Sequence, residues 1–151
     1  MTMQAKKQKS SRQKRIHTFL ILFIFLCCCI PISFAAEKIS PMTVAGTTSV
    51  TTDEAKKLFD EGVLFVDVRS TKAWNIGRIS DAVLLDIKSN FSETSLSSEA
   101  KKADPVIIYC NGSDCLRSAK ASKMAVGWGF TKIYYYRDGF PAWKKAGYPI
   151  E

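Results

Sequence analysis

Histidine is almost absent from this sequence, and its absence excludes several kinds of catalytic site. The single histidine among the 151 residues is His17, near the N-terminus. The rest of the chain therefore cannot form a Ser-His-Asp triad or the Cys-His pair of a protease. It cannot supply a histidine ligand to zinc either, and two cysteines without histidine make a poor zinc site. We expect no bound metal and no cofactor.

Acidic residues are missing from the first 36 positions, and this explains most of the net charge of +8. Six basic residues precede the first apolar run: Lys6, Lys7, Lys9, Arg12, Lys14 and Arg15. Without them, 16 basic and 14 acidic residues remain, which is a net charge of about +2. The body of the chain therefore lacks the footprint of a nucleic-acid-binding protein.

The N-terminal 35 residues have the three parts of an export signal. Their basic region ends at Arg15, and a continuous apolar run covers residues 19–30. Pro31 then interrupts the helix, and Ser33 and Ala35 are small residues of the kind that precedes a cleavage site. We predict cleavage after Ala35 and export of the mature protein, to the periplasm.

An uncleaved membrane anchor is the alternative, because residues 16–34 are almost long enough to span a bilayer. The positive-inside rule sends the body across the membrane in both cases. We therefore divide the chain into a signal peptide or anchor (residues 1–35), a polar linker (residues 36–48) and one domain (residues 49–151). The domain keeps two of the five cysteines, Cys110 and Cys115, in a compartment that permits disulfides.

Strand and helix patterns alternate along the domain. Thr51 and Glu54 have the spacing of a capping box at the start of a helix, which Gly62 ends. Apolar runs predict strands over residues 63–68, 82–87, 105–110 and 132–136. Helical periodicity follows the third strand as far as Trp128, and Pro141 marks the first turn of a last helix. The alternation predicts an α/β domain whose parallel sheet is covered by helices on both faces.

Three of the predicted strand ends carry charged or reactive residues, at the edge where such sheets bind ligands. The first end has Asp67 and Arg69, the second has Cys110, and the third has Arg137 and Asp138. We expect a pocket at this edge with Cys110 at its floor. Arg69 and Arg137 are candidate contacts for an anionic substrate.

Cys110 is either a nucleophile or a buried, inert core residue. It ends a predicted strand, and a helix begins a few residues later with Ser113 or Asp114 as the expected N-cap. A sulfur at that place faces unpaired backbone N–H groups and the positive end of the helix dipole, which favour a thiolate and bind anions. A nucleophile that is already a thiolate needs no histidine base. Transfer of sulfur from a sulfane donor is one reaction of this kind.

Three segments, in order, resemble those of the rhodanese-like family. They are FVDVRSTKAWNIGRISDAVLLD, VIIYCNGSDCLRSAKAS and GWGFTKIYYYRDGFPAWKKAGYPI. In the first segment the matching residues are Asp67, Arg69, Trp74, Gly77, Ile79 and Ala82. The resemblance covers residues 49–147 and implies a three-layer α/β domain with a parallel sheet of about five strands.

The resemblance further implies that Cys110 carries sulfane sulfur as a persulfide. Its cradle would be the backbone N–H groups of the next five residues: Asn111, Gly112, Ser113, Asp114 and Cys115. The first arginine after the cysteine is Arg117, which gives C-x6-R where the family usually has C-x4-R. The loop also holds Asp114 and no cation, which disfavours the thiosulfate dianion unless Arg69, Arg117 or Arg137 supplies positive charge. We expect Asp67 to order the loop through hydrogen bonds.

Cys115 has three possible roles: a resolving thiol, a disulfide partner of Cys110, or a packing residue. The leading hypothesis is an exported sulfurtransferase that takes sulfur from a small donor and passes it to a thiol or similar acceptor, a protein acceptor included. The alternatives are a thiol-disulfide or persulfide redox protein that uses Cys110 and Cys115, and a non-catalytic binding module. A phosphatase is disfavoured, because a phosphate-gripping loop needs C-x5-R spacing.

Overall fold

The computed structural model describes residues 39–151. The predicted signal or anchor, residues 1–35, lies outside the described residues, and so do the first three residues of the predicted linker. None of the helices within residues 39–151 has the length and apolar character needed to traverse a bilayer.

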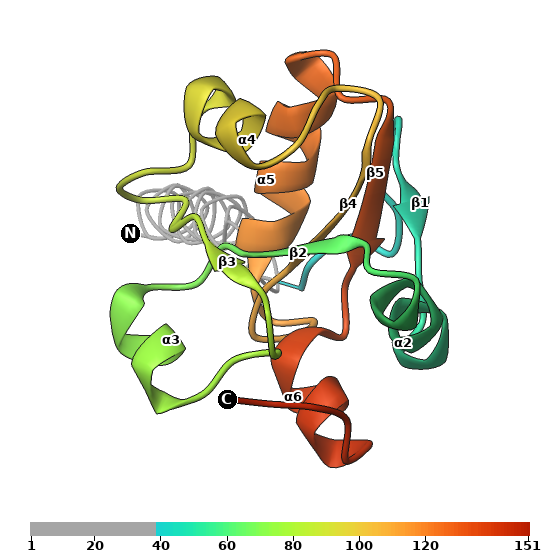
Figure 1. The fold of residues 1–151 in the computed structure, drawn as a ribbon, viewed down its shortest axis with the longest axis vertical. Helices are drawn as coiled ribbons and strands as arrows, with labels where there is room; N and C mark the ends of the chain where they lie inside the picture. The colour runs from blue at the N-terminus through green and yellow to red at the C-terminus, as the bar shows by residue number, and fades with distance from the viewer. Residues whose placement is uncertain (1–38) are drawn as a thin grey trace, which may run out of the picture. The chain divides into compact units, whose positions relative to one another are not determined.

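A five-stranded parallel sheet forms the centre of the domain (Figure 1). The strands are β1 (Thr48–Ser49), β2 (Leu64–Asp67), β3 (Val83–Leu84), β4 (Pro105–Tyr109) and β5 (Lys132–Tyr136). Their order across the sheet is β1-β5-β4-β2-β3, and every neighbouring pair is parallel. This sheet confirms the α/β fold class and the strand number expected from the sequence.

Helices cover both faces of the sheet, as the sequence predicted (Figure 1). They are α2 (Thr52–Asp60), α3 (Thr71–Ile76), α4 (Glu93–Glu99), α5 (Leu116–Gly127) and α6 (Gly139–Lys145). One cluster of buried side chains joins Val106 and Ile108 of β4 to α4 and α5. The other cluster joins Ile107 and Tyr109 of the same strand to α2 and α6. Successive side chains of β4 thus point to opposite faces of the sheet and pack into two separate cores, because side chains alternate along a strand.

Both ends of α2 lie where the sequence predicted them. Thr51 and Glu54 form the predicted capping box, in which each side chain accepts a bond from the other residue's backbone N–H. Gly62 follows the helix with a φ of +76°, which a residue without a side chain adopts at low cost.

The segment predicted as a linker is part of the folded domain from residue 39 onward. We call residues 39–47 the N-terminal strap. Ser40 is buried, its N–H donates to the carbonyl of Ser113 at 2.7 Å, and its own carbonyl accepts from Arg137 Nε at 3.1 Å. The carbonyl of Pro41 accepts from the Tyr135 hydroxyl at 3.1 Å. The strap is fixed mainly through backbone N–H and carbonyl groups, which side-chain patterns in the sequence do not predict.

Candidate functional site

Because the strands are parallel, β2, β4 and β5 end at one edge of the sheet, and α5 and α6 begin shortly after β4 and β5. Asp67 ends β2, Tyr109 ends β4, and Tyr136 ends β5. Tyr109 is in register with both of the others. Cys110, the residue after β4, therefore lies in the middle of this edge, where the sequence predicted a site.

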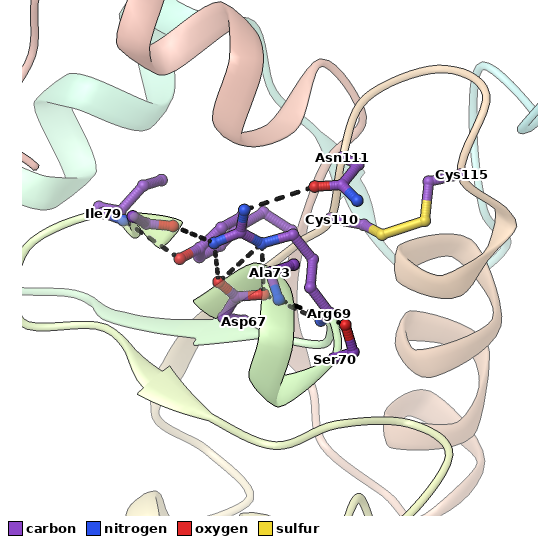
Figure 2. A network of polar contacts seen from close by, with 10 residues as sticks. Asp67, Arg69, Ser70, Ala73, Ile79, Cys110, Asn111 and Cys115 are labelled. Carbon is purple, nitrogen blue, oxygen red and sulfur yellow. Dashed lines mark hydrogen bonds and ion pairs between the residues drawn. A yellow bond between two sulfur atoms is a disulfide. The ribbon is translucent and has the colours of Figure 1, made fainter. Parts of the chain in front are cut away.

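Arg69 is held by Asp67 in a buried ion pair (Figure 2). Nη2 of Arg69 lies 2.6 Å from Asp67 Oδ2, and Nε lies 2.9 Å from both carboxylate oxygens. Nη2 also donates to the carbonyl of Gly77 at 2.8 Å, and the guanidinium stacks 4.4 Å from the ring centre of Phe140. Arg69 is 2% exposed, and its Nε and Nη2 groups are bonded to Asp67 and Gly77. Arg69 thus connects the end of β2, the segment after α3 and the Phe140 ring of α6. Its contact with an anionic substrate stays a prediction.

Asn111 connects this ion pair to the loop that follows Cys110. Its Oδ1 lies 3.4 Å from Nη1 of Arg69, which is a long hydrogen bond. Asp67 also accepts the backbone N–H of Arg69 at 2.9 Å, so its carboxylate orders the chain after β2 as well as the guanidinium.

The other two candidate arginines are half-buried and do not line a pocket beside Cys110 within the described chain. Arg137 binds the N-terminal strap through Ser40, and Arg117 lies in the first turn of α5 without an ion pair to any described residue. The predicted pocket between Arg69 and Arg137 stays a prediction, because neither side chain lines the described pocket at the loop.

Cys110 and Cys115 form a disulfide (Figure 2). Their Cα atoms are 6.3 Å apart, within the usual range of about 4.4 to 6.8 Å. Cys110 is completely buried, whereas Cys115 is half-buried. The N-cap of α5 is Cys115, one or two residues later than predicted, and its side chain makes no capping bond because the sulfur is joined to Cys110. In this state neither cysteine of residues 39–151 is a free thiol.

The loop from Asn111 to Cys115 curls around the end of β4. The N–H of Cys115 donates to the carbonyl of Gly112 at 3.0 Å, which closes the turn. Gly112 has a φ of +100°, and a Cβ there would lie 3.3 Å from the carbonyl oxygen of Asp138, so glycine is required twice over. The backbone N–H groups of the four residues between the two cysteines, residues 111–114, have no hydrogen-bond acceptor within residues 39–151. Successive free N–H groups of this kind form an anion-binding concavity.

A pocket of about 340 Å³ opens on the outer side of this loop. Its lining residues are Asn111, Gly112, Ser113, Asp114, Asp138, Pro141, Ala142 and Lys145. Two carboxylates and one ammonium give the lining a formal charge of −1. Lys145 was not predicted, although its place one helical turn after Pro141 and Ala142 puts all three on one face of α6.

A larger groove, about 680 Å³, lies between the N-terminal strap and α5. Its lining is mostly apolar and includes Val44, Leu116 and Val126, with Lys120 and Lys123 as the charged members. Neither pocket is lined by a cysteine, but four residues of the loop between Cys110 and Cys115 line the smaller one, so we assign the chemistry to that pocket.

Tyr109 does not replace the missing histidine as a base. Its hydroxyl accepts the N–H of Ile79 at 3.3 Å. Burial raises the pKa of Tyr109 above its usual value, and the nearby charge of Asp67 raises it further. Its phenol is therefore neutral at physiological pH. The described residues also contain no cluster of three or more His, Cys, Asp or Glu side chains that would hold a metal ion.

Comparisons with known proteins agree with this geometry. The family model of the rhodanese-like domain matches residues 51–146. A thiosulfate sulfurtransferase GlpE from Pseudomonas syringae pv. syringae is 33% identical over 99 residues, which cover 66% of this chain and 88% of that protein. The rhodanese-like domain-containing protein 17 of Arabidopsis thaliana is 24% identical over 148 residues and covers 90% of this chain and 89% of its own length.

Solved structures share the fold at lower identity. The rhodanese-like domain of the Alr3790 protein from Anabaena superimposes with a TM-score of 0.58 at 23% identity, covering 70% of this chain and 78% of that one. A polysulfide-sulfur transferase homodimer from Wolinella succinogenes gives a TM-score of 0.59 at 23% identity, covering 71% and 80%. The five-stranded parallel sheet, the cysteine at the end of β4 and the family match over residues 51–146 together place this chain in the rhodanese-like domain family.

Proposed function

We propose that this protein is a sulfurtransferase that carries sulfane sulfur on Cys110. In the reduced form the Cys110 thiolate attacks the terminal sulfur of a donor, the donor's remainder leaves, and a persulfide stays on the protein. A thiol acceptor then removes the outer sulfur. The membership in the rhodanese-like family and the similarity to thiosulfate sulfurtransferases support this reaction class.

The observation that carries the proposal is the environment of Cys110. It follows a buried strand and precedes four backbone N–H groups that have no acceptor within the described chain. Those groups can hold the negative outer sulfur of a persulfide without any cationic side chain. The absence of a histidine base from residues 39–151 is consistent with a nucleophile that reacts as a thiolate.

The net negative charge of the pocket lining affects which sulfur donor the protein prefers. Because Asp114 and Asp138 outnumber Lys145 in the lining, a dianion such as thiosulfate is repelled relative to a donor with a single negative charge. We therefore propose organic persulfides and organic thiosulfonates as better donors than thiosulfate. The acceptor is a small thiol or a thiol-bearing protein.

We also propose that the reaction takes place outside the cytoplasm. The basic and apolar regions before Pro31, followed by Ser33 and Ala35, support export, either as a cleaved protein in the periplasm or as an anchored one facing it. Nucleic acid has no part in the proposal, since the body carries almost no net charge.

Sulfide release from benzenethiosulfonate, with dithiothreitol as the acceptor, tests the assignment of Cys110. The Cys110→Ser protein should fall to the uncatalysed rate, because a serine oxygen cannot carry a sulfane sulfur. The Cys115→Ser protein is the matched control and should keep at least a tenth of the activity. Full activity of Cys110→Ser would refute the proposal and leave a binding module as the better description.

A further inference from the structure

We infer that Cys115 is a resolving thiol, so that this protein reduces sulfane sulfur to sulfide and ends each turn as the Cys110–Cys115 disulfide. The inference rests on the proposed persulfide at Cys110 and adds a second reaction to it. It also names a partner class: a dithiol reductant, either a protein or a small molecule, that reopens the disulfide.

The loop geometry brings the two sulfurs together without rearrangement. The Cα atoms of Cys110 and Cys115 lie 6.3 Å apart, and the N–H of Cys115 is bonded to the carbonyl of Gly112, which fixes the curl between them. The strap adds a second restraint, since the N–H of Ser40 donates to the carbonyl of Ser113 at 2.7 Å. Cys115 is therefore the nearest thiol acceptor that a persulfide on Cys110 can meet, and it needs no diffusion to arrive.

The start of α5 suits Cys115 for attack. Cys115 is the N-cap of a helix of 12 residues, where the positive end of the helix dipole favours negative charge. No side chain of the first turn of α5 is acidic, and the carboxylate of Asp114, just before the N-cap, is exposed to solvent, which screens its charge. Among the residues that the structure describes, these are the only two cysteines, so no other thiol of the domain competes.

The resolving step balances as follows. The Cys115 thiolate attacks Sγ of Cys110, a new S–S bond forms between the two cysteines, and the bond from Sγ to the outer sulfur breaks. The electron pair of that bond leaves with the outer sulfur, which takes a proton from water and departs as hydrosulfide. The sulfane sulfur gains two electrons, and the two thiolates lose one each as they become the disulfide.

Reduction of the Cys110–Cys115 disulfide should begin with attack on the Cys115 sulfur. Cys110 is completely buried, whereas Cys115 is half-buried, so an incoming thiolate reaches the Cys115 sulfur and expels Cys110 as the leaving thiolate. The expelled sulfur lies next to the free N–H groups of the loop, which stabilise it. The second thiol of the reductant then releases Cys115, and the donor-ready form returns.

A single turnover without any thiol acceptor tests this inference. The protein is reduced, the reductant is removed, and benzenethiosulfonate is added, since its product is a sulfinate that does not reduce disulfides. The wild type should release one hydrosulfide per chain, lose the free thiols of Cys110 and Cys115, and retain no extra sulfur in its intact mass. Cys115→Ser should instead gain one sulfur and release none, and serine at an N-cap preserves the helix.

The outcomes separate the inference from the proposed function. If the wild type keeps the extra sulfur, releases no sulfide and retains a free thiol at Cys115, the resolving role is wrong while Cys110 remains the sulfur carrier. If neither the wild type nor Cys115→Ser takes up sulfur or releases sulfide, the proposed sulfurtransferase function itself fails. Cys115→Ala serves as a second variant in case the serine hydroxyl perturbs the loop.

Discussion

The backbone N–H of Phe140 donates a hydrogen bond to the carbonyl oxygen of Cys110 at 2.9 Å, which fastens the first turn of α6 to the end of β4. This contact requires the preceding residue to lack a side chain. A Cβ on Gly139 would lie 2.2 Å from that same oxygen and 2.8 Å from the N–H nitrogen of Gly112. The position of Cys110 thus depends on a glycine 29 residues away in the chain.

Gly139→Ala should therefore displace the loop around Cys110. We expect the free energy of unfolding to fall by about 3 kcal/mol, from the overlap and from the φ of +62°, and sulfur transfer to fall at least about tenfold. Gly147→Ala is the control, because its φ of +74° is similar but nothing lies within 4 Å of its Cβ position. It should cost about 1 kcal/mol and leave activity unchanged. Equal effects of the two substitutions would contradict the prediction.

Breaking the buried ion pair should be costly. Asp67→Asn leaves the Arg69 guanidinium buried without its counter-charge, and we expect the free energy of unfolding in urea to drop by about 3 to 5 kcal/mol. The matched control is Asp60→Asn, which breaks an exposed pair with Lys56 and should change stability by less than about 1 kcal/mol. A loss below 1 kcal/mol for Asp67→Asn would show that the pair does not brace the site.

The charge of the pocket lining should set the preference among donors. Asp114→Asn should raise kcat/KM for thiosulfate by about threefold, and Lys145→Gln should lower it by a similar factor, since each charge acts on a dianion through partly screened solvent. Both effects should be smaller for the monoanion benzenethiosulfonate. They should also shrink in 1 M salt, where the screening length is about 3 Å. Identical ratios for the two donors would exclude an electrostatic origin.

Stability should decline at alkaline pH partly through Tyr136. Burial raises the pKa of Tyr136 to about 12 from its ordinary value of 10, and its hydroxyl donates to Thr52 Oγ1 at 3.1 Å. The folded pKa is the higher one, so this contribution is complete below pH 10 and is lost as the pH rises toward 12. Between pH 9 and pH 11.5, about the range in which this linkage acts, denaturation of Tyr136→Phe should depend less steeply on pH than that of the wild type. Parallel pH profiles would contradict this.

Processing of the N-terminus is testable directly in cells. The protein isolated from its native compartment should begin at Ala36 by N-terminal sequencing, because Ser33 and Ala35 form the expected cleavage signal. Ala35→Leu should block the cleavage and give a longer, membrane-held species. A full-length wild-type protein that stays in membranes after salt and carbonate washing would favour the anchor.

Local patterns predicted much of this fold. The run KIYYY forms β5 over the same five residues that the sequence indicated, and the Thr51–Glu54 capping box starts α2. Both signals are local: an apolar run in one case and a spacing of three residues in the other. The strand β1 was missed because a two-residue edge strand has no periodicity to detect.

The site was harder to predict, because its roles depend on contacts between distant segments. The sequence placed Arg69 at the correct edge but not its partner. The spacing of Asp67 and Arg69 by two residues, which puts both on one side of an extended chain, was the available signal. Nothing local indicated that Arg137 binds the strap through Ser40, since these residues are 97 positions apart.

The N-terminal strap and β1 also determine where the folding unit begins. Thr48 and Ser49 pair with Tyr134 and Tyr135, so β1 occupies the outer edge of β5. A protein trimmed to residues 51–146, the extent of the family match, would leave this edge of β5 unpaired and would remove the acceptor for Arg137. An uncovered strand edge is a template for pairing with another chain, so the trimmed domain is expected to self-associate. A protein made for structural or biochemical work should therefore start before Ser40.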